Sequence, residues 1–414
     1  MRISWTSSPG RARALFALTV TALSFLLWLA RWESPKGQYL PDSYAYANRA
    51  YEMAGYAPAE AGTIAMSDTC MWLHHRVDQA RFAHACHPGH ARIRPEYAAI
   101  FRDRVGFPGL VALMLPALHR QAFVVATALC AVLSALVLAW IMRLLGASRA
   151  VASLAVVLLF NVRGATWLAR VGSEAPALVG ILGVVAGLLV LSRPPTRRSL
   201  SLGLPVVTAS ALWLLAVRPS SGVLLSLLVV LVYGTAALVT RDKQRALMAA
   251  GGLIAAGVDA LWMRLRHSPG LSVTLQDTFT RHFSLPPVSG LGRRYLHLLL
   301  GTCHRLGLGM LHHPVTPLIA LIGTVVALRL REFRLPALCV VALAVASAAT
   351  HPIFSEVPRL ISPGTSVEAV GLAMGLSFLA RELRSRFHGS FVPDPVPSTT
   401  SRQSRGAAPR HTGQ

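Results

Sequence analysis

The chain has 414 residues, of which 53% are hydrophobic and only 14% charged, and this composition excludes an ordinary soluble protein. Its 40 Lys and Arg against 17 Asp and Glu give a formal net charge of +23, which in a soluble protein would suggest nucleic acid. The basic residues instead lie mainly between apolar segments and in the tail, as in membrane loops. We therefore expect an all-α polytopic membrane protein without a nucleic-acid partner.

The first apolar segment covers residues 14–30 and follows Arg2, Arg11 and Arg13. A signal peptide is the competing interpretation, but this segment is long for a signal core and no small-residue cleavage site follows it. Its length just suffices to cross a bilayer. We interpret it as a retained first span with a cytoplasmic N-terminus.

The stretch 40–56, LPDSYAYANRAYEMAGY, comes directly after this span. Asp42 is a good N-cap residue, residues 43–54 read as a short helix, and Gly55 is a natural stop. On this helix Asp42 and Tyr46 share one face, while Tyr44 lies on another. Asp42 is therefore either a helix cap or a carboxylate placed for catalysis just outside the membrane.

The predicted first loop, residues 31–104, contains eight of the seventeen acids. If this loop is extracytoplasmic, Cys70 and Cys86 are able to form a disulfide. Five histidines also lie in it, but their spacing matches no zinc pattern, so we predict a solvated loop and no metal site.

The apolar segments and the basic turns between them predict about ten transmembrane helices in a membrane domain of residues 1–380. Segments 105–118 and 293–311 are instead expected to lie at the membrane interface, and the basic tail 381–414 is expected to be disordered and cytoplasmic. Both termini are then cytoplasmic in a multi-pass protein of the cell membrane. The predicted spans are 14–30, 122–142, 150–162, 174–191, 202–217, 221–240, 246–263, 316–328, 335–350 and 366–379.

This topology places a set of polar residues on the outer side of the membrane. An arginine fork suits a phosphate, and a carboxylate suits removal of a proton from an attacking hydroxyl, so the set fits transfer of a group from a lipid phosphate. Each residue also has a purely structural interpretation, as a span anchor, a loop charge or a helix cap. The set comprises Asp42 with its tyrosines, Glu174, Arg163, Arg170, Arg218, His351, Glu356 and Arg359.

Short motifs along the chain resemble those of the multi-spanning glycosyltransferases of the GT-C fold, including protein mannosyltransferases and the aminoarabinose transferases of lipid A. These enzymes have a cytoplasmic N-terminus, one span, and then a large outer loop that opens with an acid and a Tyr-containing helix. The similar stretches here are Pro41-Asp42-Ser43-Tyr44-Ala45-Tyr46, RVGFPGL at 104–110, LLGASR at 144–149, VGSEA at 171–175, Arg218-Pro219, and Arg359 in the last outer loop.

The resemblance implies a GT-C-like fold and transfer of a sugar from a polyprenyl-phosphate donor, beside membrane lipid, to an unidentified outer acceptor. Asp42 would be the general base and Glu174 a candidate second acid, because Ser43 stands where many members have an adjacent acid. A divalent cation is the one cofactor left open. The residues assigned to substrate binding are Tyr44, Tyr46, Arg163, Arg170, Arg218, His351 and Arg359.

Two other classes of function remain open. A transporter or flippase of a lipid-linked or anionic solute would need ionisable groups within its spans, where Asp259 is the only deep acid. A non-catalytic assembly protein with the same fold would also fit, because fold does not determine activity.

Overall fold

A computed structural model describes residues 9–34, 38–39, 42–73, 86, 94–161, 165–194, 196–280, 283 and 285–389. The chain forms two compact units, Met1–Gly375 and Leu376–Gln414. The second unit contains the end of the last helix, up to Gly389, and the rest of the predicted disordered tail lies outside the described residues.

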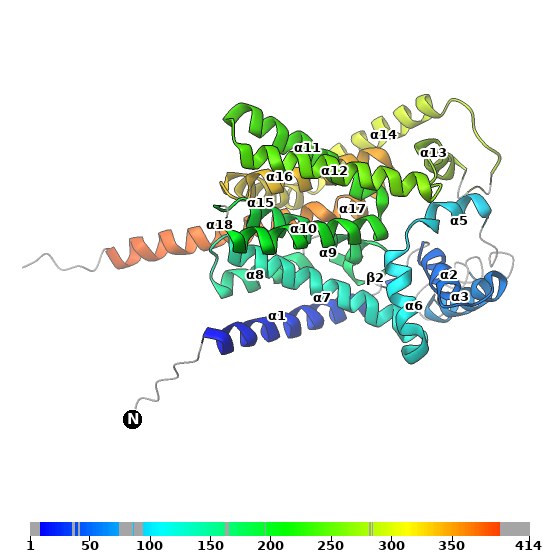
Figure 1. Ribbon diagram of the computed structural model, residues 1–414, viewed down its shortest axis with the longest axis horizontal. Helices are drawn as coiled ribbons and strands as arrows, with labels where there is room; N and C mark the ends of the chain where they lie inside the picture. Colours follow the sequence, from blue (N-terminus) through cyan, green and yellow to red (C-terminus); the bar gives the residue numbers. More distant parts are fainter. Residues whose placement is uncertain are drawn as a thin grey trace, which may run out of the picture. The chain divides into compact units, whose positions relative to one another are not determined.

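All ten predicted spans are helical in the structure (Figure 1). A bilayer core offers no water to the backbone N–H and C=O groups, and a helix satisfies this requirement by pairing them within itself. The corresponding helices are α1 (Pro9–Trp32), α7 (Gln121–Leu144), α8 (Arg149–Asn161), α9 (Glu174–Leu191), α10 (Arg197–Val217), α11 (Pro219–Thr240), α12 (Lys243–Leu265), α15 (Val315–Arg329), α16 (Arg334–Thr350) and α18 (Ser362–Gly389).

Six of these helices, α1, α7, α9, α10, α11 and α12, are long and apolar enough to cross a membrane. The helix α14 (Leu291–His312) passes the same test only together with α15, and the two are bent by 101°. The apolar helices α8 and α16 are shorter, as is α6 (Gly106–Leu118). The chain is thus a helical polytopic membrane protein, and the count of ten spans stays a prediction.

The helix α9 is the centre of the first unit, and almost its whole surface is buried. It packs against α7 and most closely against α10. Glycines 180, 183 and 187 make this approach feasible: a Cβ at Gly180 would lie 2.9 Å from Leu214 Cβ, and one at Gly187 would lie 3.0 Å from the Val207 nitrogen. Small residues at such spacing allow helices to associate in lipid, where van der Waals packing drives the association.

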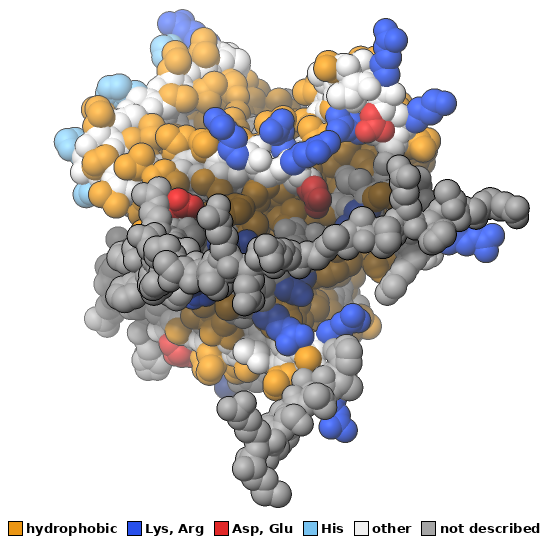
Figure 2. Space-filling model, turned by 90° about the vertical axis from the view of Figure 1, so that its left-hand side faces the viewer, with side chains coloured by type: hydrophobic (Ala, Val, Ile, Leu, Met, Phe, Trp, Pro, Cys, Tyr) orange, Lys and Arg blue, Asp and Glu red, His pale blue; other side chains and the backbone are white. Residues whose placement is uncertain are grey.

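Basic turns meet at one end of the unit. Arg193 donates to the carbonyl of Leu144 at 2.6 Å, and the Gln244 amide donates to the carbonyl of Arg193 at 2.9 Å. The turns that follow α7, α9 and α11 therefore lie side by side. Figure 2 looks onto this end, where Lys and Arg side chains gather among apolar side chains.

The opposite end of α9, at Glu174, is where the shorter elements assemble. The strands β1 (Gln38–Tyr39) and β2 (Arg170–Val171) pair in parallel, with Gln38 beside Arg170. In Figure 1 the short helices are gathered at this end of the bundle beside α6. They are α2 (Ser43–Met53), α3 (Pro58–Leu73) and α5 (Pro95–Arg102), while η2 (Ala165–Ala169), α13 (Leu271–Phe279) and α17 (Val357–Leu360) complete the elements.

Candidate active site

Five charged side chains from four segments form one group, which we call the ionic cluster: Asp42, Glu174, Arg218, Glu356 and Arg359. Asp42 precedes α2, Glu174 opens α9, Arg218 stands at the corner between α10 and α11, and Glu356 and Arg359 belong to α17 and its start. All five belong to the polar set expected on the outer side from sequence, but Glu356 was given no role in the predicted site.

Arg359 is the centre of the ionic cluster. Its terminal Nη2 lies 2.7 Å from Asp42 Oδ2, its Nε 2.5 Å from Glu174 Oε1, and its Nη1 3.3 Å from Glu356 Oε2. The Arg359 side chain is 9% exposed, so its contacts with Asp42 and Glu174 are shielded from water. Each guanidinium nitrogen thus has a different carboxylate, and the two neighbouring acids raise the pKa of Arg359 despite its burial.

Asp42 occupies the N-cap position of α2, but its side chain makes no capping hydrogen bond, so the cap interpretation is wrong. Its Oδ1 accepts a hydrogen bond from the Tyr97 hydroxyl at 3.0 Å, while Oδ2 faces Arg359. Both oxygens are therefore engaged with residues far away in the sequence. Tertiary ion pairing has displaced the local cap, because a guanidinium is a stronger partner than a backbone amide.

These partners set the acidity of Asp42. Burial by itself raises the pKa of this carboxyl, but the charge and hydrogen bond of Arg359, the charge of Arg104 and the Tyr97 hydroxyl together lower it to about 2. The carboxylate is ionised throughout the physiological range. Asp42 is therefore a weak base, and its pKa rises only when Arg359 moves away from it.

Ser43, where many GT-C enzymes would have a second acid, has a structural role here. Its side chain is fully buried and its hydroxyl donates to the carbonyl of Val171 at 2.5 Å. This bond fastens the start of α2 to β2. A carboxylate at this position would face that carbonyl oxygen.

Glu174 lies at the first turn of α9 and is 3% exposed. A helix N-terminus favours negative charge. Its Oε1 is shared between Arg359 and Arg218, whose Nη2 lies 3.7 Å away, while its Oε2 is buried and has no hydrogen-bond partner among the described residues. The buried hydroxyl of the adjacent Ser173 likewise has none there, so this part of the site retains unused hydrogen-bonding groups.

Aromatic residues form a second layer around these charges. The Tyr46 side chain is fully buried, its hydroxyl accepts from Arg104 at 3.0 Å, and its ring packs edge-on against Phe101 and Phe107. Sequence reasoning did not select Tyr97 or Arg104 as site residues. Arg104 opens the RVGFPGL motif and was detectable there, whereas Tyr97 carries no sequence signal.

The remaining predicted residues lie at varying places. Arg170 stacks over the Trp167 ring at 4.1 Å, on the side of the ionic cluster. Burial lowers the pKa of its guanidinium, which the nearby Glu174 raises and Arg359 lowers. Tyr44 instead donates to the carbonyl of Gly62 on α3 at 3.3 Å. Arg163 and the predicted His-rich stretch of the first loop fall outside the described residues.

His351 follows α16 and its Nδ1 lies 3.3 Å from the Thr278 hydroxyl. Burial lowers the pKa of its imidazole more than the nearby acids, Glu356 and Asp277, raise it. A neutral imidazole beside the ionic cluster can accept a proton. His351 is therefore a second candidate base.

Cys70 and Cys86 form a disulfide with their Cα atoms 5.6 Å apart, in the pairing considered from the sequence. This bond joins the last turn of α3 to Cys86, further along the chain. Among the described residues, no group of three or more His, Cys, Asp or Glu side chains is arranged to hold a metal ion.

Comparison with protein-family models and with curated protein sequences finds no match to this chain.

Proposed function

We propose that the protein is a glycosyltransferase of the GT-C type that moves a sugar from a polyprenyl-phosphate donor to an acceptor outside the cytoplasm. The observation that carries the proposal is Arg359, which holds Asp42 and Glu174 at 2.7 and 2.5 Å with Arg218 beside them. Four segments far apart in sequence thus bring two carboxylates and two arginines to one place.

The donor's phosphate would enter by exchange of partners. A phosphate has the charge and geometry to take over the guanidinium of Arg359 and to bind Arg218 as well. Asp42 would then lose its counter-ion, and its pKa would rise from about 2 towards the value of an ordinary carboxyl. Donor binding would thereby convert a fully paired carboxylate into a usable general base.

In the transfer step, the acceptor oxygen forms a bond to the anomeric carbon of the sugar while the bond from that carbon to the phosphate oxygen breaks. The acceptor's proton passes to Asp42, and the negative charge that develops on the leaving polyprenyl phosphate is stabilised by Arg359 and Arg218. Glu174 would keep both arginines in place. Tyr46 supports Asp42's helix through its buried ring.

The charge that a divalent cation would supply at these acids already comes from a guanidinium. Asp42 and Glu174 share Arg359, so a cation would have to compete with it for the same carboxylate oxygens. The proposed reaction therefore has no metal step.

The membrane orientation follows from the positions of the charges. The basic turns at the end of α9 near Leu191 would face the cytoplasm, according to the positive-inside rule. The ionic cluster at Glu174 would then face outward, both termini would be cytoplasmic, and ten helices would cross a cell membrane. Polyprenyl phosphate would reach the cluster from the surrounding lipid.

The test is transfer from a synthetic lipid-linked sugar by protein purified in detergent, compared for the parent chain, Asp42→Asn and Asp242→Asn. Asp242 provides a matched control, because it caps α12 at the basic end through two backbone bonds that asparagine can also accept. Loss of a general base lowers the rate by about 10²- to 10⁴-fold. Full transfer by Asp42→Asn would refute the catalytic role.

A non-catalytic assembly protein is the second candidate, and the complete pairing of Arg359 favours it. Every guanidinium nitrogen of this arginine already has a carboxylate, as in a purely structural lock. Such a protein would show no transfer above background with any lipid-linked sugar. The transporter alternative has less support: Asp259 accepts a hydrogen bond from Ser226 at 3.2 Å and thereby joins α12 to α11.

A further inference from the structure

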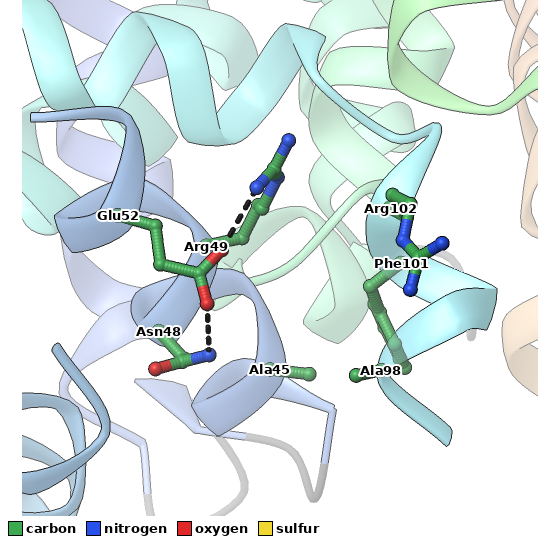
Figure 3. Close-up of a pocket in the computed structure, with 7 residues that line it drawn as sticks. All are labelled: Ala45, Asn48, Arg49, Glu52, Ala98, Phe101 and Arg102. Atoms are coloured by element: carbon green, nitrogen blue, oxygen red, sulfur yellow. Dashed lines mark hydrogen bonds and ion pairs between the residues drawn. The ribbon is translucent and has the colours of Figure 1, made fainter. Parts of the chain in front are cut away.

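A small pocket of about 150 Å³ lies between α2 and α5, apart from the ionic cluster (Figure 3). One wall is the polar face of α2 with Asn48, Arg49 and Glu52, and the other is α5 with Phe101 and Arg102. Figure 3 shows Ala45 and Ala98 pointing toward one another between these walls. Their small side chains leave the space that forms the pocket.

The hydrogen-bonding groups of the pocket are only partly used. Glu52 accepts from Asn48 Nδ2 at 3.1 Å and from Arg49 Nη1 at 2.8 Å. The Asn48 Oδ1 and the Arg49 Nε are both buried and have no partner within the described protein. A buried polar group without a partner is unfavourable, so a ligand that reached these two atoms would be stabilised by hydrogen bonds to them.

The charges of the pocket indicate the class of ligand. Arg49 and Arg102 are cationic and Glu52 is anionic, which leaves one positive charge uncompensated. Glu52 is held by the pocket's own donors, whereas Arg102 is exposed and forms no ion pair in the described structure. The free groups are thus two cationic donors and one amide acceptor, which match an anionic group carried beside a hydroxyl.

Both walls of the pocket belong to helices that hold Asp42. Ala45 lies one turn after Asp42 on α2, and Tyr97 of α5 donates to Asp42 Oδ1 at 3.0 Å. The pocket is therefore formed by the two helices whose residues position the carboxylate proposed as the base. The donor's phosphate would bind other arginines, Arg359 and Arg218.

We propose that this pocket binds the sugar acceptor through an anionic group, either a phosphate or a carboxylate. Arg102 and Arg49 would bind the anion, and a hydroxyl of the acceptor would donate to Asn48. This assignment of the acceptor class rests on the proposed transferase function, although the binding of an anionic sugar is measurable without transfer.

The experiment measures binding of glucose 6-phosphate, glucuronate and uncharged glucose to the detergent-purified protein by calorimetry, with inorganic phosphate as a further probe. The variants are Arg102→Gln and Asn48→Ala, with Arg94→Gln as the matched control. Replacing Arg94 removes the same charge from the same helix. Arg94 is exposed, makes no side-chain cap bond and does not line the pocket, so its loss should leave the pocket unchanged.

We expect Arg102→Gln to weaken binding of at least one anionic sugar by about tenfold, the loss expected for one charge-assisted hydrogen bond. The control should bind as the parent does, and glucose should bind least. A phosphate source is assigned if glucose 6-phosphate binds in preference to glucuronate, and a carboxylate source if the order is reversed. Binding of inorganic phosphate as tight as that of the sugars would contradict the role of Asn48.

The proposal is overturned if no anionic sugar binds, or if Arg102→Gln and Arg94→Gln have equal effects. Failure of the transferase proposal gives a different result: Asp42→Asn would keep full transfer, or the parent would show none, while the anionic sugar still binds in a manner that depends on Arg102. A transferase that requires Asp42 but binds sugars regardless of Arg102 would refute the pocket alone.

Discussion

Replacing Arg359 by Gln tests the central assumption about the ionic cluster. The change leaves Asp42 and Glu174, which lie 2.7 and 2.5 Å from the guanidinium, as buried carboxylates without this counter-ion. Breaking a buried pair by removal of one partner destabilises a protein by about 3–5 kcal/mol. Glu356 adds little, because its side chain is 30% exposed and solvent screens the pair.

The free energy of unfolding in mixed detergent is the quantity to measure, for the parent and for Arg359→Gln. Arg305→Gln on the exposed surface of α14 is the control, and we expect it within about 0.5 kcal/mol of the parent. Adding Glu174→Gln to the Arg359 variant removes one orphaned charge and should restore part of the loss. If Arg359→Gln stays within about 1 kcal/mol of the parent, or the double variant regains nothing, the cluster is not the buried unit described above.

Three further predictions follow from particular contacts. Because the pKa of Asp42 is lowered to about 2 from 3.8, its pairing with Arg359 stabilises the folded protein above pH 4 and is lost as the pH falls through about 2. The parent should lose about 2 kcal/mol more than Asp42→Asn between pH 4 and 2, as measured by unfolding at each pH. Maleimide should label one thiol of the folded, unreduced protein, Cys303, because Cys130 and Cys339 are buried and the other two cysteines are paired; labelling of two or more thiols, counted by mass spectrometry, would contradict this. Gly183→Ala should destabilise the α9–α10 contact by about 1–3 kcal/mol, because a Cβ there would overlap the Ser210 side chain, whereas Gly251→Ala, with open space around it, should be neutral or stabilising in the same unfolding assay.

Patterns within short stretches of sequence were sufficient to locate the apolar helices and α2. Apolar length located all ten predicted span segments, and α2 was expected at 43–54 and found at Ser43–Met53. Gly55, expected as the stop, has φ +98°, a conformation that favours glycine. These features depend on residues close together in the chain, so they are readable without knowledge of the fold.

Local pattern failed for the roles of individual polar residues. The cap interpretation of Asp42 came from its sequence neighbours alone, while its partners are 55 residues away at Tyr97 and still further away at Arg359. Tyr97 was missed for the same reason, and Glu356 was placed on the outer side without a role. Tyr44 and Tyr46 were both assigned to substrate binding, yet one faces α3 and the other faces Arg104.

Hydrophobic length and charge act within a single segment, so the amino-acid sequence suffices to predict a helical membrane protein with basic turns. Which charges meet depends on how the helices pack. Arg359 and Glu174 are 185 positions apart, and no pattern of neighbouring residues predicts that α17 lies against the first turn of α9. Burial makes this pairing important for stability, because a charge removed from water needs a partner of opposite charge. Here three acids share one guanidinium.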